Sequence, residues 1–159
     1  MVEFFQSQQG LELHAVRNTR PEFKTNENVH WHKADLRNSS EVDRLLEKCR
    51  PDIIIQAAAT TSGSKDIVNR PYVHVTDNAV MNSYIFKAAY DHSVKHVLFF
   101  SCTVMYPSST APISEENYDA NVKPHPKYFG VAHTKLYLEK MGEFYTDISE
   151  TKYTVIRHS

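Results

Sequence analysis

Glycine is scarce in this sequence. The 159 residues include only Gly10, Gly63, Gly130 and Gly142, whereas an average usage near 7% would give about 11. The four lie far apart, so no segment has the cluster of glycines with which a phosphate-binding loop approaches its ligand. We conclude that these 159 residues contain no glycine-rich phosphate loop.

Cysteine, excess charge and long apolar stretches are also missing. The two cysteines, Cys49 and Cys102, predict reduced thiols in a cytoplasmic protein rather than a disulfide framework. A formal net charge of −1 provides no basic surface for nucleic acid or for an acidic membrane. The apolar runs are too short to span a membrane, and no cleavable signal precedes them. We therefore expect neither nucleic acid nor a membrane as a partner.

The sequence alternates strand-like and helix-like segments in units of roughly 30 residues, which is typical of βαβ crossovers. The segments 52–59 and 96–103 are nearly continuous apolar runs, as expected for strands buried on both faces of a parallel sheet. The pattern predicts one α/β domain with a doubly wound parallel sheet. Strands are expected at residues 11–16, 29–36, 52–59, 96–103 and 153–156, and helices at 2–9, from Ser39 or Ser40 to Cys49, at 76–92 and at 128–148.

In sheets of this kind, ligands bind beyond the carboxyl ends of the strands. The residues to consider therefore lie where each apolar run becomes polar. They are Arg17, Asn18 and Arg20, then Asp35, Leu36 and Arg37, and the segments 57–63, 101–106 and 157–159.

Several segments of the sequence, taken in order along the chain, resemble a known family. They are Ala-Asp-Leu-Arg-Asn at 34–38, Asp-Ile-Ile-Ile-Gln-Ala-Ala-Ala at 52–59, the run 78–89 that begins with Asn78, Phe-Ser-Cys-Thr-Val-Met-Tyr-Pro at 100–107, and Thr-Lys-Leu-Tyr-Leu-Glu at 134–139. The set is similar to the extended short-chain dehydrogenases/reductases, the NAD(P)-dependent sugar-nucleotide epimerase/dehydratase family. Within that family it is most similar to the GDP-L-fucose synthases.

The resemblance covers nearly the whole chain but only about half of a family member. The family begins with a strand and a GxxGxxG turn, and residues 2–9 resemble the end of the helix that follows them. A sugar-nucleotide domain follows the last strand. The resemblance thus implies that residues 1–159 are a partial Rossmann-like NAD(P)-binding domain. The first strand, the glycine-rich loop and the C-terminal substrate domain would be absent, and the chain alone is expected to be inactive.

The family transfers a hydride between a nicotinamide cofactor and a nucleotide-sugar substrate. It uses a tyrosine activated by a lysine four residues later, and Lys135 matches this lysine, which also binds the nicotinamide ribose. Val131 stands at the tyrosine position and cannot carry a proton. Tyr128 is the nearest candidate, although it lies roughly 10 Å from Lys135 along an ideal helix.

The family also orients the sugar with a serine or threonine hydroxyl, and that position is Cys102 here. A one-residue bulge would bring Thr103 or Ser101 there instead, while a buried structural role is the alternative for Cys102. For the cofactor, the resemblance implies contacts from Arg17, Asp35, Leu36, Ala57, Ala58, Ala59, Asn78 and Lys135.

The cofactor is expected to be NADP, with NAD as the alternative. An acid after the second strand of the family would bind the ribose 2′-hydroxyl of NAD, whereas an arginine accommodates the 2′-phosphate of NADP. Residues 15–20 include Arg17 and Arg20 and no acid. The other interpretation is that both are solvated loop charges.

No metal site is predicted. His30 and His32 share one strand face and His14 lies on a neighbouring strand, but no acid or cysteine is close in sequence to complete a zinc site.

Two further functions remain open. One is a UDP- or dTDP-sugar 4-epimerase or dehydratase that uses NAD; the other is a non-catalytic nucleotide-binding or interaction module, which Val131 and Cys102 favour. The resemblance also implies a homodimer formed through the helices 76–92 and 128–148.

Overall fold

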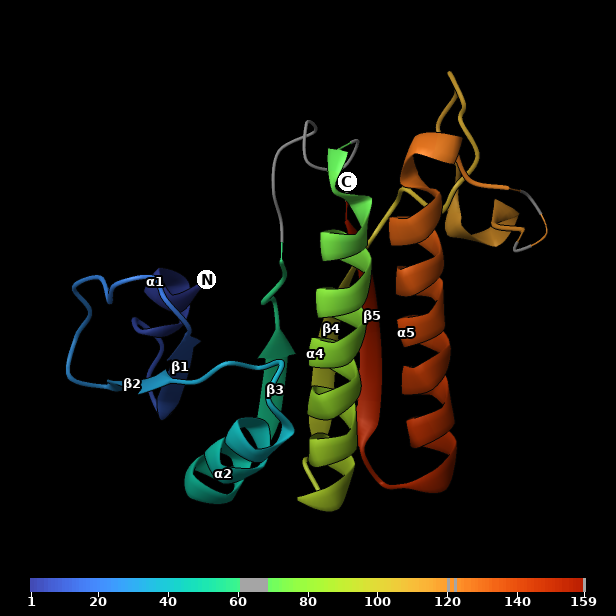
Figure 1. Cartoon of the computed structure of the whole chain (residues 1–159). Coiled ribbons are helices and arrows are strands. Elements are labelled where there is room, and N and C mark those ends of the chain that lie inside the picture. Colours follow the sequence, from blue (N-terminus) through green and yellow to red (C-terminus); the bar gives the residue numbers. More distant parts are fainter. Residues whose placement is uncertain (61–68, 120, 122, 159) are drawn as a thin grey trace.

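The computed structural model describes residues 1–60, 69–119, 121 and 123–158; Gly63 and Ser159 lie outside this part of the chain. Strands and helices alternate as the sequence predicts, and the α/β class is confirmed (Figure 1). The elements are α1 (Val2–Phe5), β1 (Leu13–Arg17), β2 (Val29–Lys33), α2 (Ser39–Cys49), β3 (Ile53–Gln56), α4 (Pro71–Asp91), β4 (His96–Cys102), η1 (Glu115–Asn117), η2 (Pro126–Tyr128), α5 (Phe129–Ile148) and β5 (Lys152–His158).

All strand pairs are parallel, but the described strands are divided between two sheets. β1 pairs with β2 in a register that runs from Leu13–Val29 to Arg17–Lys33. In the second sheet β4 lies between β3 and β5. Within the described residues, β1 and β3 therefore each have one strand neighbour.

The burial of the strands differs from the prediction. The segment 52–59 was expected to be buried on both faces, yet Ile53 is 55% exposed and only Gln56 of β3 is buried. That expectation is wrong because β3 lies at the edge of its sheet and receives fewer neighbours than an internal strand. In β4, Val97, Phe99 and Ser101 are buried while the residues between them are half-buried, so one face is covered more fully than the other.

The core lies between the three-stranded sheet and the helices α4 and α5, which run side by side in front of β4 and β5 (Figure 1). Phe86 of α4 makes edge-on contacts with the rings of Phe99 and Tyr153, with centroids 5.4 and 5.2 Å away. Gly130 permits the close approach of α4 and α5, since a Cβ atom there would lie 2.8 Å from Val75 Cγ2.

The helix ends refine the sequence prediction. Asn38, rather than Ser39 or Ser40, caps α2, because its side-chain oxygen accepts hydrogen bonds from two backbone N–H groups of the first turn. α4 begins earlier than expected, at Pro71, a residue suited to the first helical position. α5 begins at Phe129, which leaves Tyr128 just outside the helix. No described helix is both long and apolar enough to cross a membrane.

Candidate cofactor and catalytic site

A buried ladder of amide side chains holds the turn that follows β3. Asn78 of α4 accepts a hydrogen bond from the Thr60 N–H at 2.9 Å and donates to the Thr60 and His74 carbonyls. Asn82, one turn further along, donates to the Asn78 carbonyl and accepts from the Gln56 side chain at 2.9 Å. Asn78 is 7% exposed. It therefore acts through the backbone of this turn, as a positioning residue.

The turn itself consists of Ala57, Ala58 and Ala59, all exposed. Methyl side chains leave the backbone of the turn open to a flat ligand. The family resemblance predicts that the cofactor lies against this turn. Leu36, from the same predicted set, packs against the main core instead.

Charged residues connect the end of β2 to α4. The Asp35 carboxylate accepts hydrogen bonds from the Arg37 guanidinium at 2.8 and 3.0 Å and from the Arg37 backbone N–H. Arg37 also donates to Asp77 of α4 at 3.0 Å, and Asp77 accepts from the Thr60 hydroxyl. Asp35 and the turn after β3 thus belong to one hydrogen-bond network, although they come from different sheets.

The ion pair predicts an acid-dependent loss of stability. Hydrogen bonds from Arg37 hold the pKa of Asp35 at about 2, below its ordinary value of 3.8. Because the folded-state pKa is the lower one, Asp35 stabilises the fold above about pH 4, and this stabilisation disappears as the pH falls toward 2. We expect Asp35→Asn to cost no more than about 1 kcal/mol at neutral pH, since the pair is solvent-screened. Urea denaturation at several pH values measures this, and Arg37→Gln should remove the same pH dependence.

Lys135 and Cys102 meet at the carboxyl end of β4. The Lys135 Nζ donates to the Phe100 carbonyl at 2.6 Å and lies 4.5 Å above the Phe99 ring. Burial lowers the pKa of Lys135, and the nearby Cys102 and Glu139 act in the opposite direction. Burial also raises the pKa of Cys102, more than the Lys135 charge lowers it. Cys102 is therefore a protonated thiol at neutral pH, and its environment does not favour a reactive thiolate.

Thr103 and Ser101, on either side of Cys102 in the sequence, lie in different surroundings. Thr103 lines a cavity of about 350 Å³ at the ends of β4 and β5. Ser101 is fully buried and donates to the Glu139 carboxylate at 2.5 Å. Of the two candidate hydroxyls, Thr103 is the one placed at a cavity. The other lining residues are Tyr106, Pro107, Ser109, Ala111, Ile113, Glu115 and Arg157.

Arg157, which lines this cavity, forms an ion pair with Glu139 that the sequence did not predict. Arg157 of β5 donates to Glu139 of α5 at 2.7 Å and to the Tyr106 hydroxyl at 3.0 Å, and it lies 4.7 Å from the Tyr118 ring. Glu139 is only 5% exposed. The sequence drew attention to Glu139 only as the last residue of the run 134–139, which carries part of the family resemblance. Its partner, however, follows from the packing of α5 on β5.

Two predicted residues lie apart from these groups. The Tyr128 ring packs against His125 with centroids 5.8 Å apart, and the Lys127 Nζ lies 5.6 Å from its centre. Arg17 donates through Nε and Nη2 to one oxygen of Glu22, at 2.9 and 2.8 Å. Glu22 falls two residues beyond the window that suggested NADP, so a 2′-phosphate at Arg17 would compete with this carboxylate.

The sequence profile of the NAD dependent epimerase/dehydratase family matches residues 2–159. The chain belongs to this family. Among curated proteins it is similar to the GDP-L-fucose synthase of Sinorhizobium fredii, with 31% identity over 85 residues, which are 53% of this chain and 27% of that protein. The GDP-L-fucose synthase of Azorhizobium caulinodans is 27% identical over 74 residues, 46% of this chain and 24% of that protein.

Solved structures give the same family relationship. A GDP-L-fucose synthetase from Naegleria fowleri bound to NADP is 26% identical with a TM-score of 0.68, covering 80% of this chain and 44% of that one. The UDP-glucose 4-epimerase of Thermotoga maritima, at 20% identity, shares the fold with a TM-score of 0.80 over 98% of this chain and 50% of that one. The epimerase/dehydratase chain described here thus matches about a quarter of these curated relatives and at most half of these solved chains.

The predicted site residues of this epimerase/dehydratase chain fall into separate groups. One group surrounds the turn after β3, a second lies at the end of β4, and two residues stand alone. The first contains Asp35, Asn78 and Ala57, Ala58 and Ala59; the second contains Cys102, Thr103 and Lys135; Arg17 and Tyr128 are separate.

Proposed function

We propose that this chain forms the central part of the cofactor domain of an NADP-dependent epimerase/reductase that acts on a nucleotide-sugar, of the GDP-L-fucose synthase type. The observation that carries the proposal is the position of Lys135, whose amine reaches the carboxyl end of β4 near Cys102. Thr103, the next residue along the chain, lines a cavity at the same end of the sheet. Membership of the epimerase/dehydratase family and similarity to two GDP-L-fucose synthases support it.

The arrangement of the strands supports a longer parent protein. β1 and β3 each have an edge without a strand partner among the described residues. One further parallel strand between them would give the order β2-β1-x-β3-β4-β5, which is that of a doubly wound dinucleotide-binding sheet. Such a strand, with a glycine-rich turn at its carboxyl end, would supply the pyrophosphate contacts that these 159 residues lack. A substrate domain would be the second addition.

The residues present fit the two ends of a dinucleotide better than its middle. The exposed alanine turn and Asp35 would lie along the adenosine half, and Lys135 would donate hydrogen bonds to the nicotinamide ribose. When bound, the cofactor supplies or accepts the hydride. Thr103 would orient the sugar oxygen, and the ammonium of Lys135 would stabilise negative charge that develops nearby. Tyr128 is the nearest phenol to the usual proton-donor position, and reaching Lys135 would require its ring to leave His125.

A non-catalytic nucleotide-binding module is the second candidate. Val131 stands one helical turn before Lys135, where the family carries its tyrosine, and Cys102 is a protonated thiol. A homodimer in a cytoplasmic setting belongs to the leading proposal, and the exposed Tyr137 and Phe144 of α5 are compatible with such an interface.

The test uses the longest protein that the gene encodes, with the 159-residue chain beside it. Mixed with NADPH and GDP-4-keto-6-deoxymannose, the longer protein is expected to consume NADPH, which is measured as the loss of NADPH absorbance. The shorter chain is expected to consume none.

Arg17→Ala in the longer protein should reduce the preference for NADPH over NADH roughly 10-fold, the equivalent of one charge-assisted hydrogen bond.

Three results would contradict the proposal. If the longer protein bound NADPH but consumed none of it, either with GDP-4-keto-6-deoxymannose or with UDP-galactose, the non-catalytic module would be favoured. Turnover of UDP-galactose with NAD, but not of the GDP-sugar with NADPH, would favour a 4-epimerase. If neither cofactor bound to the longer protein, the cofactor-domain assignment itself would be wrong.

A further inference from the structure

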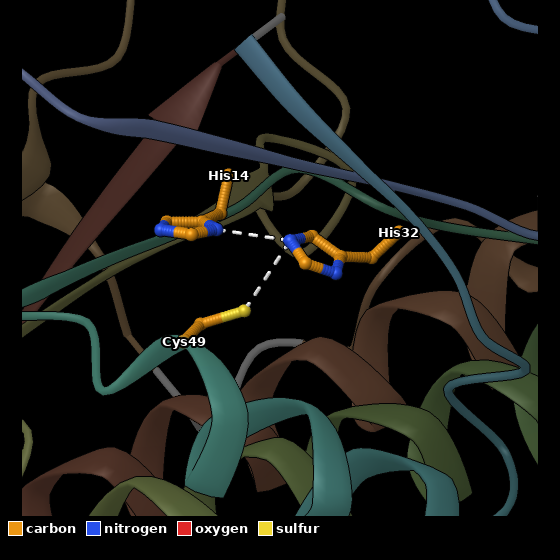
Figure 2. Close-up of side chains that lie close together, drawn as sticks. All are labelled: His14, His32 and Cys49. Atoms are coloured by element: carbon orange, nitrogen blue, oxygen red, sulfur yellow. Dashed lines mark hydrogen bonds between the residues drawn. The ribbon is translucent and has the colours of Figure 1, made fainter. Parts of the chain in front are cut away.

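Three metal-ligating side chains from three elements converge away from the cofactor site. They are His14 of β1, His32 of β2 and Cys49, the last residue of α2 (Figure 2). The His14 Nδ1 lies 2.9 Å from the His32 Nε2, and the Cys49 Sγ lies 3.5 Å from the same nitrogen. All three donor atoms lie within 4.8 Å of one another, and the three residues are half-buried.

The strand register explains why the two histidines meet. His14 pairs with His30, and Val16 pairs with His32, so His14 and His32 are diagonal neighbours on one face of the parallel pair. Helix α2 follows β2 and ends with Cys49 beneath that face (Figure 2). The ligand set is therefore produced by the β1–β2 pairing and by the length of α2.

An outer carboxylate orients the first histidine. Glu12 Oε1 lies 3.2 Å from the His14 Nε2. A proton on Nε2 donated to this carboxylate leaves the Nδ1 lone pair of His14 directed at His32 and Cys49. Carboxylates commonly fix metal-binding histidines in this way.

We propose that His14 Nδ1, His32 Nε2 and Cys49 Sγ bind a zinc ion, with a water molecule as the fourth ligand. Zinc prefers tetrahedral nitrogen and sulfur ligands, and its usual bond lengths imply N–N edges of about 3.3 Å and N–S edges of about 3.6 Å. The two edges at His32, 2.9 and 3.5 Å, lie near these values. The third edge, between His14 and Cys49, is within 4.8 Å, so that binding requires the imidazoles to shift around the ion. A thiolate with two imidazoles does not suit magnesium or calcium. On binding, the Cys49 thiol releases its proton to solvent and the sulfur bonds to the ion.

The expected role of the ion is structural. The site uses none of the residues assigned to the cofactor, and it links both strands of the β1–β2 sheet to α2. Because α2 contributes Val42 and Leu46 to the main core, the ion would attach the smaller sheet to the rest of the fold. The absence of a metal site, expected from the sequence, rested on the lack of an acid or a cysteine close in sequence to the histidines. That premise overlooked Glu12, two residues before His14, and Cys49 is close only in the folded chain.

The test measures metal binding to the 159-residue chain directly. After treatment with a chelator, zinc is titrated in competition with a chromophoric chelator, and cobalt is titrated separately. We expect one zinc ion per chain and a cobalt spectrum with a thiolate-to-metal charge-transfer band. Cys49→Ser and His32→Gln should each weaken zinc binding at least 100-fold, since loss of an outer partner alone typically costs 10- to 100-fold. Glu12→Gln should weaken it about 10-fold.

Matched controls separate this site from adventitious binding by the other histidines. Cys102→Ser and His96→Gln remove the same residue types elsewhere, and both should bind zinc as the unmodified chain does. Equal zinc affinity in Cys49→Ser or His32→Gln, or a charge-transfer band that persists in Cys49→Ser, would overturn the proposal.

A second measurement on the unmodified chain does not depend on the folding of any variant. Zinc should slow the alkylation of Cys49 by iodoacetamide, followed by mass spectrometry of the peptides, and should leave that of Cys102 unchanged. Alkylation of Cys49 at the same rate with and without zinc would also overturn the proposal.

Discussion

Replacing Glu139 by alanine is expected to lower the free energy of unfolding by about 3–5 kcal/mol, because the change leaves a largely buried guanidinium without its counter-charge. The Glu139 carboxylate accepts hydrogen bonds from Ser101 and Arg157 and is only 5% exposed. The Arg157 side chain is itself 18% exposed, so solvent cannot fully replace the lost partner. Urea denaturation monitored by circular dichroism measures the change as a shift in midpoint.

Glu143, one helical turn further along α5, provides a matched control. It pairs with Lys140 on the surface, at 2.7 Å, with both side chains largely exposed. Glu143→Ala should cost no more than about 1 kcal/mol, as exposed pairs usually do. A loss in Glu139→Ala as small as that in Glu143→Ala would show that the Glu139–Arg157 pair contributes little to stability.

Replacing Lys135 by methionine is expected to reduce turnover at least 100-fold in the full-length enzyme, the lower range for loss of a group that stabilises charge in the transition state. This prediction rests on the proposed function. Methionine keeps an apolar stem over the Phe99 ring but removes the ammonium that donates to the Phe100 carbonyl. The measurement is NADPH consumption at saturating nucleotide-sugar, together with the KM for NADPH, which should rise because the ribose contact is lost.

Lys135→Met should also change how the stability of the fold depends on pH. Burial lowers the pKa of Lys135 in the folded chain, so the unfolded chain binds this proton more tightly. The stability of the unmodified chain relative to Lys135→Met should therefore increase as the pH rises toward the ordinary lysine value of 10.5. Lys140→Met, an exposed lysine on the same helix, should change neither turnover nor this pH dependence. Equal turnover in Lys135→Met and the unmodified enzyme would remove Lys135 from the reaction.

The positions of the helices and strands could be read from local patterns. Apolar periodicity identified α2, α5 and the strands to within a few residues, because each pattern depends only on which side chains face the core. The exceptions have local causes as well. Asn38 caps α2 in place of the following serines, and Pro71 starts α4 five residues before the expected position 76.

The candidate site was predicted less completely. The sequence singled out Asn78, but not that it holds the Thr60 backbone rather than a ligand. It assigned Arg17 to a phosphate without revealing that Glu22 already occupies the guanidinium. In both cases the partner lies in a loop or on another element, and no periodic pattern encodes its distance.

The sequence by itself determined that this is a parallel α/β chain of the NAD-dependent epimerase/dehydratase family that lacks a cluster of glycines. These properties depend on the order of residues along the chain. Only the tertiary structure divided the described strands between two sheets, buried Glu139 against Arg157 and brought Cys49 to His14 and His32. Those contacts join residues on different elements, and they depend on strand register, helix length and the packing of one element on another.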